Sequence, residues 1–241
     1  MPLLEIATFN AQSSILALTH GASRIELCAN QSLGGTTPSL DTLATFKSHL
    51  STSKCKPIPI NVMIRPRGGD FVFSREEITQ MKKDIAMFSA EGVHVDGFVF
   101  GVLTSEGKID EVVCRELLDC IHSATSKHQK RKNTTFHRAF DLIAPSEMDS
   151  ALETLISLGF TSVLTSGGAA SAFEGREVLA RLVRQAAGRI EVIVGGGVRS
   201  TNLEALVRET GAQAYHSSAV IGEGDVASGE EIERLSATLK S

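Results

Sequence analysis

Short apolar runs alternate along this chain with longer segments in which apolar residues recur every three or four positions. The longer segments have helical spacing, and several end at a glycine, where a left-handed residue closes a helix. These glycines are Gly21, Gly92, Gly159, Gly188 and Gly211, and an apolar run follows each of them. With three further runs, the pattern predicts strands over residues 3–9, 24–28, 59–64, 95–100, 134–136, 161–165, 190–194 and 213–216.

The starts of the helices carry signals of their own. Ser74 and Glu77 form a capping box ahead of an apolar face, and Thr201 and Glu204 have the spacing of a second box. Two further pairs of signals are expected at helix starts: Pro38 and Pro145 in first turns, and Asn10 and Asp110 as caps.

Eight strands that alternate with helices predict parallel pairing through helical crossovers. In a chain of 241 residues this pattern favours one domain over residues 1–241, folded as a single closed (β/α)8 TIM barrel of the α/β class. The alternative is an open, doubly wound sheet. It fits less well because no G-x-G-x-x-G motif follows the first strand.

Composition narrows the class of protein. The net charge is -4, Trp is absent and Tyr occurs once, so neither a basic surface nor a stacking platform for nucleic acid is expected. No apolar run is long enough to cross a membrane. Four cysteines without a C-x-x-C pattern indicate reduced thiols and a cytoplasmic protein. The basic segment 126–133 is interpreted as a solvated loop. The alternative is a targeting or nucleic-acid patch, which would make the nucleus possible.

Polar residues gather where the predicted strands end, which is the working face of a barrel. Arg65 and Arg67 follow the third strand and suit the binding of a carboxylate or phosphate; a structural salt bridge to Glu26 or Asp96 is the alternative. Glycine-rich turns after the sixth and seventh strands, together with a serine after the eighth, are typical of a phosphate site, although tight turns alone also produce them. These residues are Ser166, Gly167, Gly196, Gly197 and Ser217.

Three residues at these ends are candidates for proton transfer: Glu26, His137 and His216. Glu5 and Glu26 lie on neighbouring predicted strands. They either share a proton as a carboxylate pair or neutralise Arg24 and Arg65 in a buried network.

Cys28 shares a strand face with Arg24 and Glu26. Three roles fit its thiol: a nucleophile with His137 or His216 as base, a soft ligand for Cu(I), or a buried thiol without chemistry.

Seven stretches together resemble the copper homeostasis protein CutC family, in the order of that family. They are residues 24–28, 34–39, 62–71, 99–101, 135–141, 164–167 and 195–198. The resemblance implies a TIM barrel, a cytoplasmic protein that forms homo-oligomers, and a role in copper tolerance with Cu(I) as the bound ion. It also implies copper ligation by two cysteines, of which one matches Cys28, while Ala7 occupies the position of the other.

Two functions follow from these observations. One is a Cu(I)-binding copper homeostasis protein that uses Cys28. The other is a TIM-barrel enzyme that acts on a small anionic metabolite, with or without a phosphate group, at the mouth of the barrel. An inert scaffold would explain the fold but not the convergent charges.

Overall fold

Eight parallel strands form a closed barrel in the computed structural model, which describes residues 1–53, 55–90, 93–123 and 131–240. Each strand pairs with the next along the chain, and β8 pairs with β1. The strands are β1 (Leu3–Thr8), β2 (Arg24–Leu27), β3 (Ile60–Met63), β4 (Gly97–Phe100), β5 (Asn133–Phe136), β6 (Ser162–Thr165), β7 (Glu191–Val194) and β8 (Ala214–Ser217). The predicted TIM barrel is confirmed, and the pairing of β8 with β1 rules out the open sheet.

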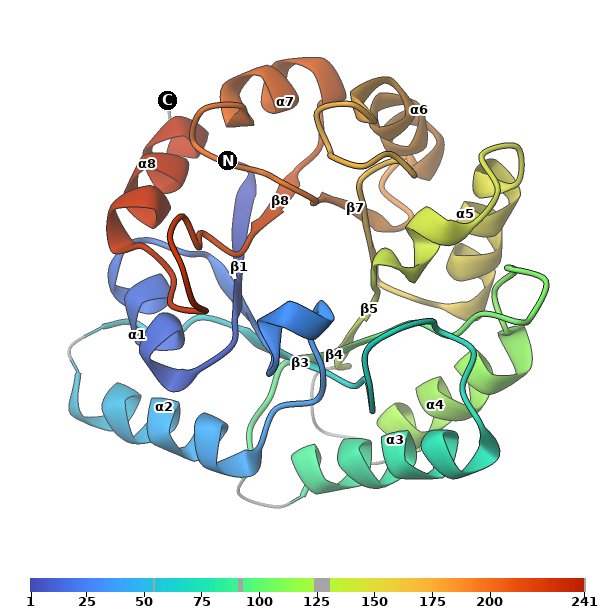
Figure 1. The fold of residues 1–241 in the computed structure, drawn as a ribbon, viewed down its shortest axis with the longest axis horizontal. Helices are drawn as coiled ribbons and strands as arrows, with labels where there is room; N and C mark the ends of the chain where they lie inside the picture. The colour runs from blue at the N-terminus through green and yellow to red at the C-terminus, as the bar shows by residue number, and fades with distance from the viewer. Residues whose placement is uncertain (54, 91–92, 124–130, 241) are drawn as a thin grey trace.

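Helices alternate with the strands and surround the barrel as an outer ring (Figure 1). They are α1 (Ala11–Thr19), α2 (Leu40–Thr52), α3 (Arg75–Phe88), α4 (Glu111–Ser123), α5 (Met148–Leu158), α6 (Arg176–Ala186), α7 (Leu203–Thr210) and α8 (Gly229–Lys240). In the part of the chain that the structure describes, two 3₁₀ turns, η1 (Gln31–Leu33) and η2 (Arg138–Leu142), lie in the loops after β2 and β5. Among the described residues, no helix is both long and apolar enough to cross a membrane.

Three of the predicted helix starts are confirmed. The backbone N–H of Glu77 donates to Oγ of Ser74 at 3.3 Å, and the N–H of Ser74 donates back to the Glu77 carboxylate at 2.8 Å. Asn10 accepts from the N–H of Ser13, and Asp110 accepts from the N–H of Val113. Each cap satisfies a backbone donor that the helix itself leaves free.

The other predicted starts are wrong. Asn202, not Thr201, is the residue before α7, and its amide oxygen accepts from the preceding Arg199 N–H at 2.9 Å instead of capping the helix. Pro38 and Pro145 lie before the helices: Ser39 caps α2, and Pro145 belongs to a turn that precedes α5.

The predicted glycine positions can be tested at four places. Gly159 and Gly211 are left-handed residues directly after α5 and α7, and Gly21 and Gly188 also have positive φ just beyond their helices. The prediction is confirmed at these four. Gly92 and residues 126–130 of the basic segment lie outside the described residues.

The main hydrophobic core lies between the strands and the ring of helices, as expected for side chains that leave the barrel outward. The interior holds two smaller apolar clusters. One comprises Leu3, Leu164, Ile193 and Ala214, and the other comprises Cys28, Met63 and Val99. Charged side chains also point inward, so the interior is a polar site as well as a packed core.

Candidate functional site

A cavity of about 100 Å³ opens at the carboxyl ends of the strands. Its walls come from strands or strand ends around the barrel and from the loops that follow β2 and β3. It is lined by Ala7, Phe9, Glu26, Cys28, Gly34, Met63, Arg65, Phe71, His137, Arg138, Leu164 and His216. Five of these lining residues are candidates that the sequence singled out: Glu26, Cys28, Arg65, His137 and His216.

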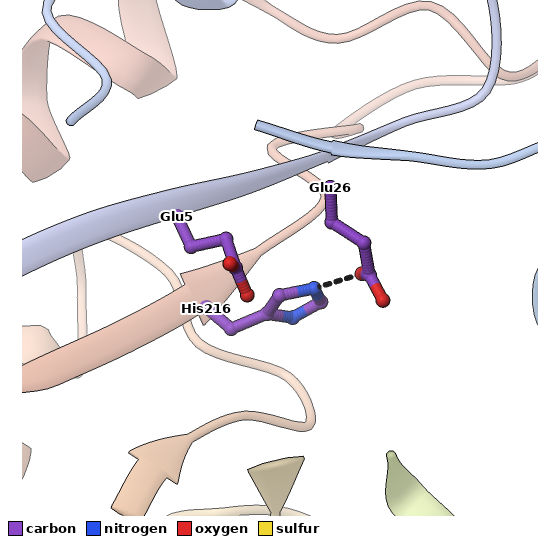
Figure 2. A group of neighbouring side chains, drawn as sticks. All are labelled: Glu5, Glu26 and His216. Carbon is purple, nitrogen blue, oxygen red and sulfur yellow. Dashed lines mark hydrogen bonds and ion pairs between the residues drawn. The ribbon is translucent and has the colours of Figure 1, made fainter. Parts of the chain in front are cut away.

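Glu26 and His216 form an ion pair inside the barrel. Nε2 of His216 lies 2.6 Å from Oε2 of Glu26, and both side chains are buried or nearly so. Figure 2 shows the imidazole beside the carboxylates of both Glu5 and Glu26. Burial opposes the charge on His216, but the Glu26 carboxylate and then Glu5 outweigh it, so the pKa of His216 is raised. The pair is therefore best described as imidazolium and carboxylate.

A second ion-paired group lies next to this pair. Arg24 donates from Nε to Glu5 at 2.5 Å and from Nη2 to Glu191 at 2.9 Å. Glu5 is thus held by Arg24, and Glu26 by His216. The buried network expected from the sequence exists around Arg24, but its second carboxylate is Glu191, which the sequence did not indicate.

Glu5, Glu26 and His216 bring one ligand atom each within 4.8 Å of one another, a spacing that could hold a metal ion. The competing partners are already present, since Arg24 pairs with Glu5 and the imidazolium pairs with Glu26. A cation here would have to displace the proton on His216. We therefore interpret this group as a proton-holding network.

His137 is held as a neutral imidazole. Its Nδ1 accepts the backbone N–H of Ala139 at 3.2 Å, so the ring proton lies on Nε2. Burial and then the nearby Arg65 lower its pKa to about 3. Nε2 has no hydrogen-bond partner among the described residues, although the ring is buried. Gly101 makes the position possible, because a Cβ there would lie 2.6 Å from Nδ1.

Arg65 points toward the cavity from the end of β3. Its guanidinium donates to the backbone oxygens of Leu33, Gly35 and Gly69 and lies 4.5 Å from the ring centre of Phe71. The predicted salt bridge to Glu26 or Asp96 is wrong. Nε of Arg65 is buried and has no partner among the described residues. The loop carbonyls fix the cation in place, and this free N–H remains for a ligand.

Arg67 lies elsewhere. Its guanidinium donates to Asp70 at 2.9 Å and to Glu77 at 2.6 Å, packs 5.1 Å from the ring centre of Phe73, and does not line the cavity. The chain has left the barrel after Pro66, so the two arginines do not share a face. The structure does not bring Arg67 to the site.

The glycine-rich turn after β6 binds the side-chain carboxylate of Asp141. The Asp141 carboxylate accepts the backbone N–H of Ser166 at 2.9 Å and of Gly168 at 3.2 Å, and the Thr165 hydroxyl at 2.5 Å. Arg138 donates to the same carboxylate at 2.7 Å. Backbone donors that would otherwise suit a phosphate are therefore occupied.

The remaining predicted anion-binding residues also lie outside the cavity lining. The Ser217 hydroxyl donates to Val198 O and accepts the Ala219 N–H, which ties two loops together. Gly196 has positive φ, and a Cβ there would lie 3.2 Å from Cζ of Arg138. Gly197 O accepts from Asn202 at 2.9 Å. An anion-binding role for these residues stays a prediction.

Sequence reasoning missed Arg138 as a site residue. It follows His137 directly, lines the cavity, and donates to Ser166 Oγ at 3.1 Å. It supplies a second cation at the mouth. Arg138 could have been recognised as a site residue because it immediately follows a candidate histidine at the end of a strand.

Cys28 is buried beside Met63, and both side chains line the cavity. Burial, followed by Glu26 and Glu5, raises the pKa of the Cys28 thiol well above its usual value, against the opposing effect of Arg65. The thiol is therefore protonated at neutral pH, which disfavours it as a nucleophile. Ala7 lines the same cavity, at the position where the family resemblance implies a second cysteine.

Comparison with known proteins agrees with the fold and the motifs. The family model for the CutC family matches residues 2–221. The human copper homeostasis protein cutC homolog is 43% identical over 217 residues, which cover 90% of this chain and 73% of that protein. A CutC family protein of Porphyromonas gingivalis is 46% identical over 216 residues, covering 89% and 79%.

Solved structures give the same result. The crystal structure of CutC from Streptococcus agalactiae superposes with a TM-score of 0.80 at 34% identity, covering 90% of this chain and 99% of that one. A phosphoribosylanthranilate isomerase from Pyrococcus furiosus has a TM-score of 0.57 at 14% identity over the whole of this chain, a likeness of fold alone. On the family match and the identity to its relatives, this chain belongs to the CutC family of copper homeostasis proteins.

Proposed function

We propose that this protein serves copper tolerance by binding Cu(I) at Cys28. The observation that carries the proposal is the pairing of two soft sulfur groups, the Cys28 thiol and the Met63 thioether, in one buried cluster at the cavity. Cu(I) prefers such ligands. Gly35 flanks both, since a Cβ there would lie 3.6 Å from Sγ of Cys28 and 3.7 Å from Cε of Met63.

The raised pKa of the Cys28 thiol sets a condition for this proposal. Burial, and then Glu26 and Glu5, keep the proton on Cys28, so Cu(I) would have to displace that proton to bind the sulfur. Met63 would then take the part that a second cysteine plays in the ligand set implied by the family resemblance, since Ala7 offers no sulfur.

A competition titration against a chromophoric Cu(I) chelator, under reducing and anaerobic conditions, tests the proposal. We expect Cys28→Ser to abolish competitive binding and Met63→Leu to weaken it. Cys55→Ser is the matched control, because Cys55 is half-exposed and lies outside the cavity lining. Unchanged affinity in Cys28→Ser would refute copper binding at this residue.

A second candidate function is catalysis on a small anionic metabolite. It is favoured by three buried polar atoms, each on a cavity-lining residue and each without a partner among the described residues: Oε1 of Glu26, Nε of Arg65 and Nε2 of His137. Buried polar groups are normally paired, and an unpaired one costs about 1–3 kcal/mol. A ligand that accepts from Arg65 and His137 and meets the carboxylate of Glu26 would satisfy all three.

A thermal-shift screen of small carboxylates and of phosphorylated metabolites tests this second function. The occupied turn at Asp141 favours the carboxylates. Stabilisation by a carboxylate should vanish in Arg65→Lys, which keeps the charge but removes Nε, and should persist in Arg67→Lys. A screen without any stabilising anion would count against the function.

The proposal extends to a cytoplasmic protein that forms homo-oligomers, on the strength of the family resemblance. Light scattering on the purified chain measures its mass in solution. A monomeric mass at all protein concentrations would contradict the proposal that the protein forms homo-oligomers.

A further inference from the structure

We propose that the cavity catalyses proton abstraction next to the carbonyl group of a small 2-oxo carboxylate, with Glu26 as the base and His137 as the hydrogen-bond donor to the carbonyl oxygen. This inference rests on the second function proposed above, and it names the substrate class and the reaction of that site. Arg65 holds the substrate carboxylate, and His216 positions Glu26.

The base is available because one carboxylate oxygen of Glu26 is bound and the other is free. Oε2 accepts a hydrogen bond from Nε2 of His216 at 2.6 Å, and this bond fixes the plane of the carboxylate. Oε1 is buried and has no partner among the described residues. Since Glu26 lines the cavity, a C–H group bound there would meet a desolvated and oriented oxygen, the requirement for a general base.

His137 is suited to stabilise the charge that forms on the carbonyl oxygen. The Ala139 N–H occupies Nδ1, so Nε2–H is the group left for a ligand. A neutral imidazole polarises a carbonyl and donates a hydrogen bond to the enolate oxygen without giving up its proton, a pattern known from enolising enzymes that pair it with a glutamate base. Glu26 on β2 and His137 at the end of β5 supply these two parts in one cavity.

The size and charge of the cavity define the substrate. A volume of about 100 Å³ lies well below the roughly 300–1,000 Å³ of pockets for drug-sized ligands, so the cavity favours a small acid. The free Nε of Arg65 is a charged donor for one carboxylate oxygen. Because Asp141 fills the turn after β6, the substrate needs no phosphate group there.

The step balances without a further reactant. The C–H bond on the carbon beside the carbonyl breaks, and its proton forms an O–H bond with Oε1 of Glu26. The electron pair of the broken C–H bond becomes the second bond of a C=C double bond, and the carbonyl π pair moves to oxygen. There the Nε2–H of His137 and Arg65 stabilise the enolate. In D₂O the new O–H of Glu26 exchanges its proton for a deuteron, and transfer of that deuteron to carbon restores the 2-oxo acid, so the reaction is visible as incorporation of deuterium.

The experiment uses the purified chain of 241 residues in D₂O with pyruvate as the probe, and follows loss of the methyl signal by proton NMR. We expect protein-dependent exchange of deuterium into the methyl group. Glu26→Gln should lower the exchange rate by about 100-fold or more, the usual contribution of a general base. Glu204→Gln is the matched control, because Glu204 is exposed on α7 and should leave the rate unchanged.

Two further variants separate catalysis from structure. His137→Gln offers an amide N–H for the carbonyl oxygen and should retain part of the exchange, whereas His137→Asn keeps only the cap to Ala139 and should lose it. His216→Gln should shift the pH profile of the exchange rate, because it removes the charge beside Glu26; a loss of folding alone would lower the rate at every pH equally.

A parallel measurement of pyruvate binding by saturation-transfer NMR distinguishes the possible failures. Binding that depends on Arg65 without exchange would overturn proton abstraction and leave the small-anion function standing. Absence of binding by pyruvate and by every carboxylate in the thermal-shift screen would overturn both. Exchange that Glu26→Gln does not alter would remove Glu26 from its role as base.

Discussion

The two oxygens of the cavity-lining Glu26 carboxylate differ in their partners: Oε2 accepts from His216 at 2.6 Å, whereas Oε1 is buried and has no partner among the described residues. The charged imidazole contacts Oε2, and the other oxygen of the same carboxylate, Oε1, is the one that we propose as the base. Its protonation should therefore be measurable in the stability of the fold as well as in its chemistry.

The first prediction concerns stability at alkaline pH. The pKa of His216 is raised in the folded protein, so its contribution is fully present below the unfolded pKa of about 6.5 and is lost as the pH rises through the folded pKa. We expect the urea midpoint of the wild type to fall over that window. In Glu26→Gln, which removes the main stabilising charge, the fall should be smaller; equal slopes would show that the pair does not control the pKa.

The second prediction concerns the acid limb and His137. Its pKa is lowered to about 3, so the unfolded chain takes up a proton below about pH 6.5 while the folded chain does not. Stability is lost as the pH falls, by at most about 1.4 kcal/mol per pH unit from this group. His137→Asn keeps an acceptor for the Ala139 N–H and should flatten the acid limb of urea unfolding. If the stability of His137→Asn falls with decreasing pH as steeply as that of the wild type, other groups cause the loss of stability in acid.

The third prediction tests the carboxylate in the turn after β6. Asp141→Asn removes the charge that meets two backbone N–H groups and Arg138, and an amide N–H replaces one acceptor. We expect a loss of about 1–3 kcal/mol in the free energy of unfolding. Asp119→Asn, on the exposed side of α4, is the control and should change it by less than about 0.5 kcal/mol.

The fourth prediction adds the missing sulfur. Ala7→Cys places a thiol on the cavity wall together with Cys28 and Met63, and we expect Cu(I) affinity to rise by about tenfold or more, equal to roughly 1.4 kcal/mol. Ala11→Cys, outside the cavity lining, controls for an added thiol. The chelator competition described above measures both. If the two variants gain equally, the cavity has no special affinity for the ion.

The fifth prediction concerns the space behind His137. Gly101→Ala would put a methyl group 2.6 Å from Nδ1 of His137 and 3.2 Å from Cβ of Ala139. We expect a destabilisation of about 1–3 kcal/mol by overpacking and displacement of the imidazole. Gly222→Ala meets nothing within 4 Å and should be tolerated. Thermal unfolding measures both, and equal melting temperatures would contradict the packing described for the ring.

Much of the fold was readable from the sequence because local rules act at each helix end. Five apolar runs that follow glycines, together with three further runs, placed all eight strands within two residues of their observed bounds. The second capping box failed because Asn202, not Thr201, is the residue before α7, and its amide oxygen accepts from the N–H of Arg199 instead. Competition between neighbouring polar side chains of similar cap preference is not settled by spacing alone.

The site was only partly readable, for a different reason. Strand ends identify which residues approach the mouth, but the direction of a side chain in a loop depends on where the chain leaves the barrel. Arg65 still follows the strand and points inward, whereas Arg67 lies two residues later and pairs with Asp70 and Glu77. The occupation of the β6 turn by Asp141 likewise requires the three-dimensional path of η2.

The pairing of β8 with β1 has a consequence for how the molecule assembles. Glu26 and His216 are 190 residues apart in the sequence, and His216 reaches the interior on the last strand, in register with Glu5 of the first. Strands β1 to β7 and their loops carry the thiol, Arg65 and His137, and only β8 supplies the imidazolium beside Glu26. The site is therefore complete only when β8 closes the barrel against β1, and the NMR signal of the His216 imidazole would report that closure.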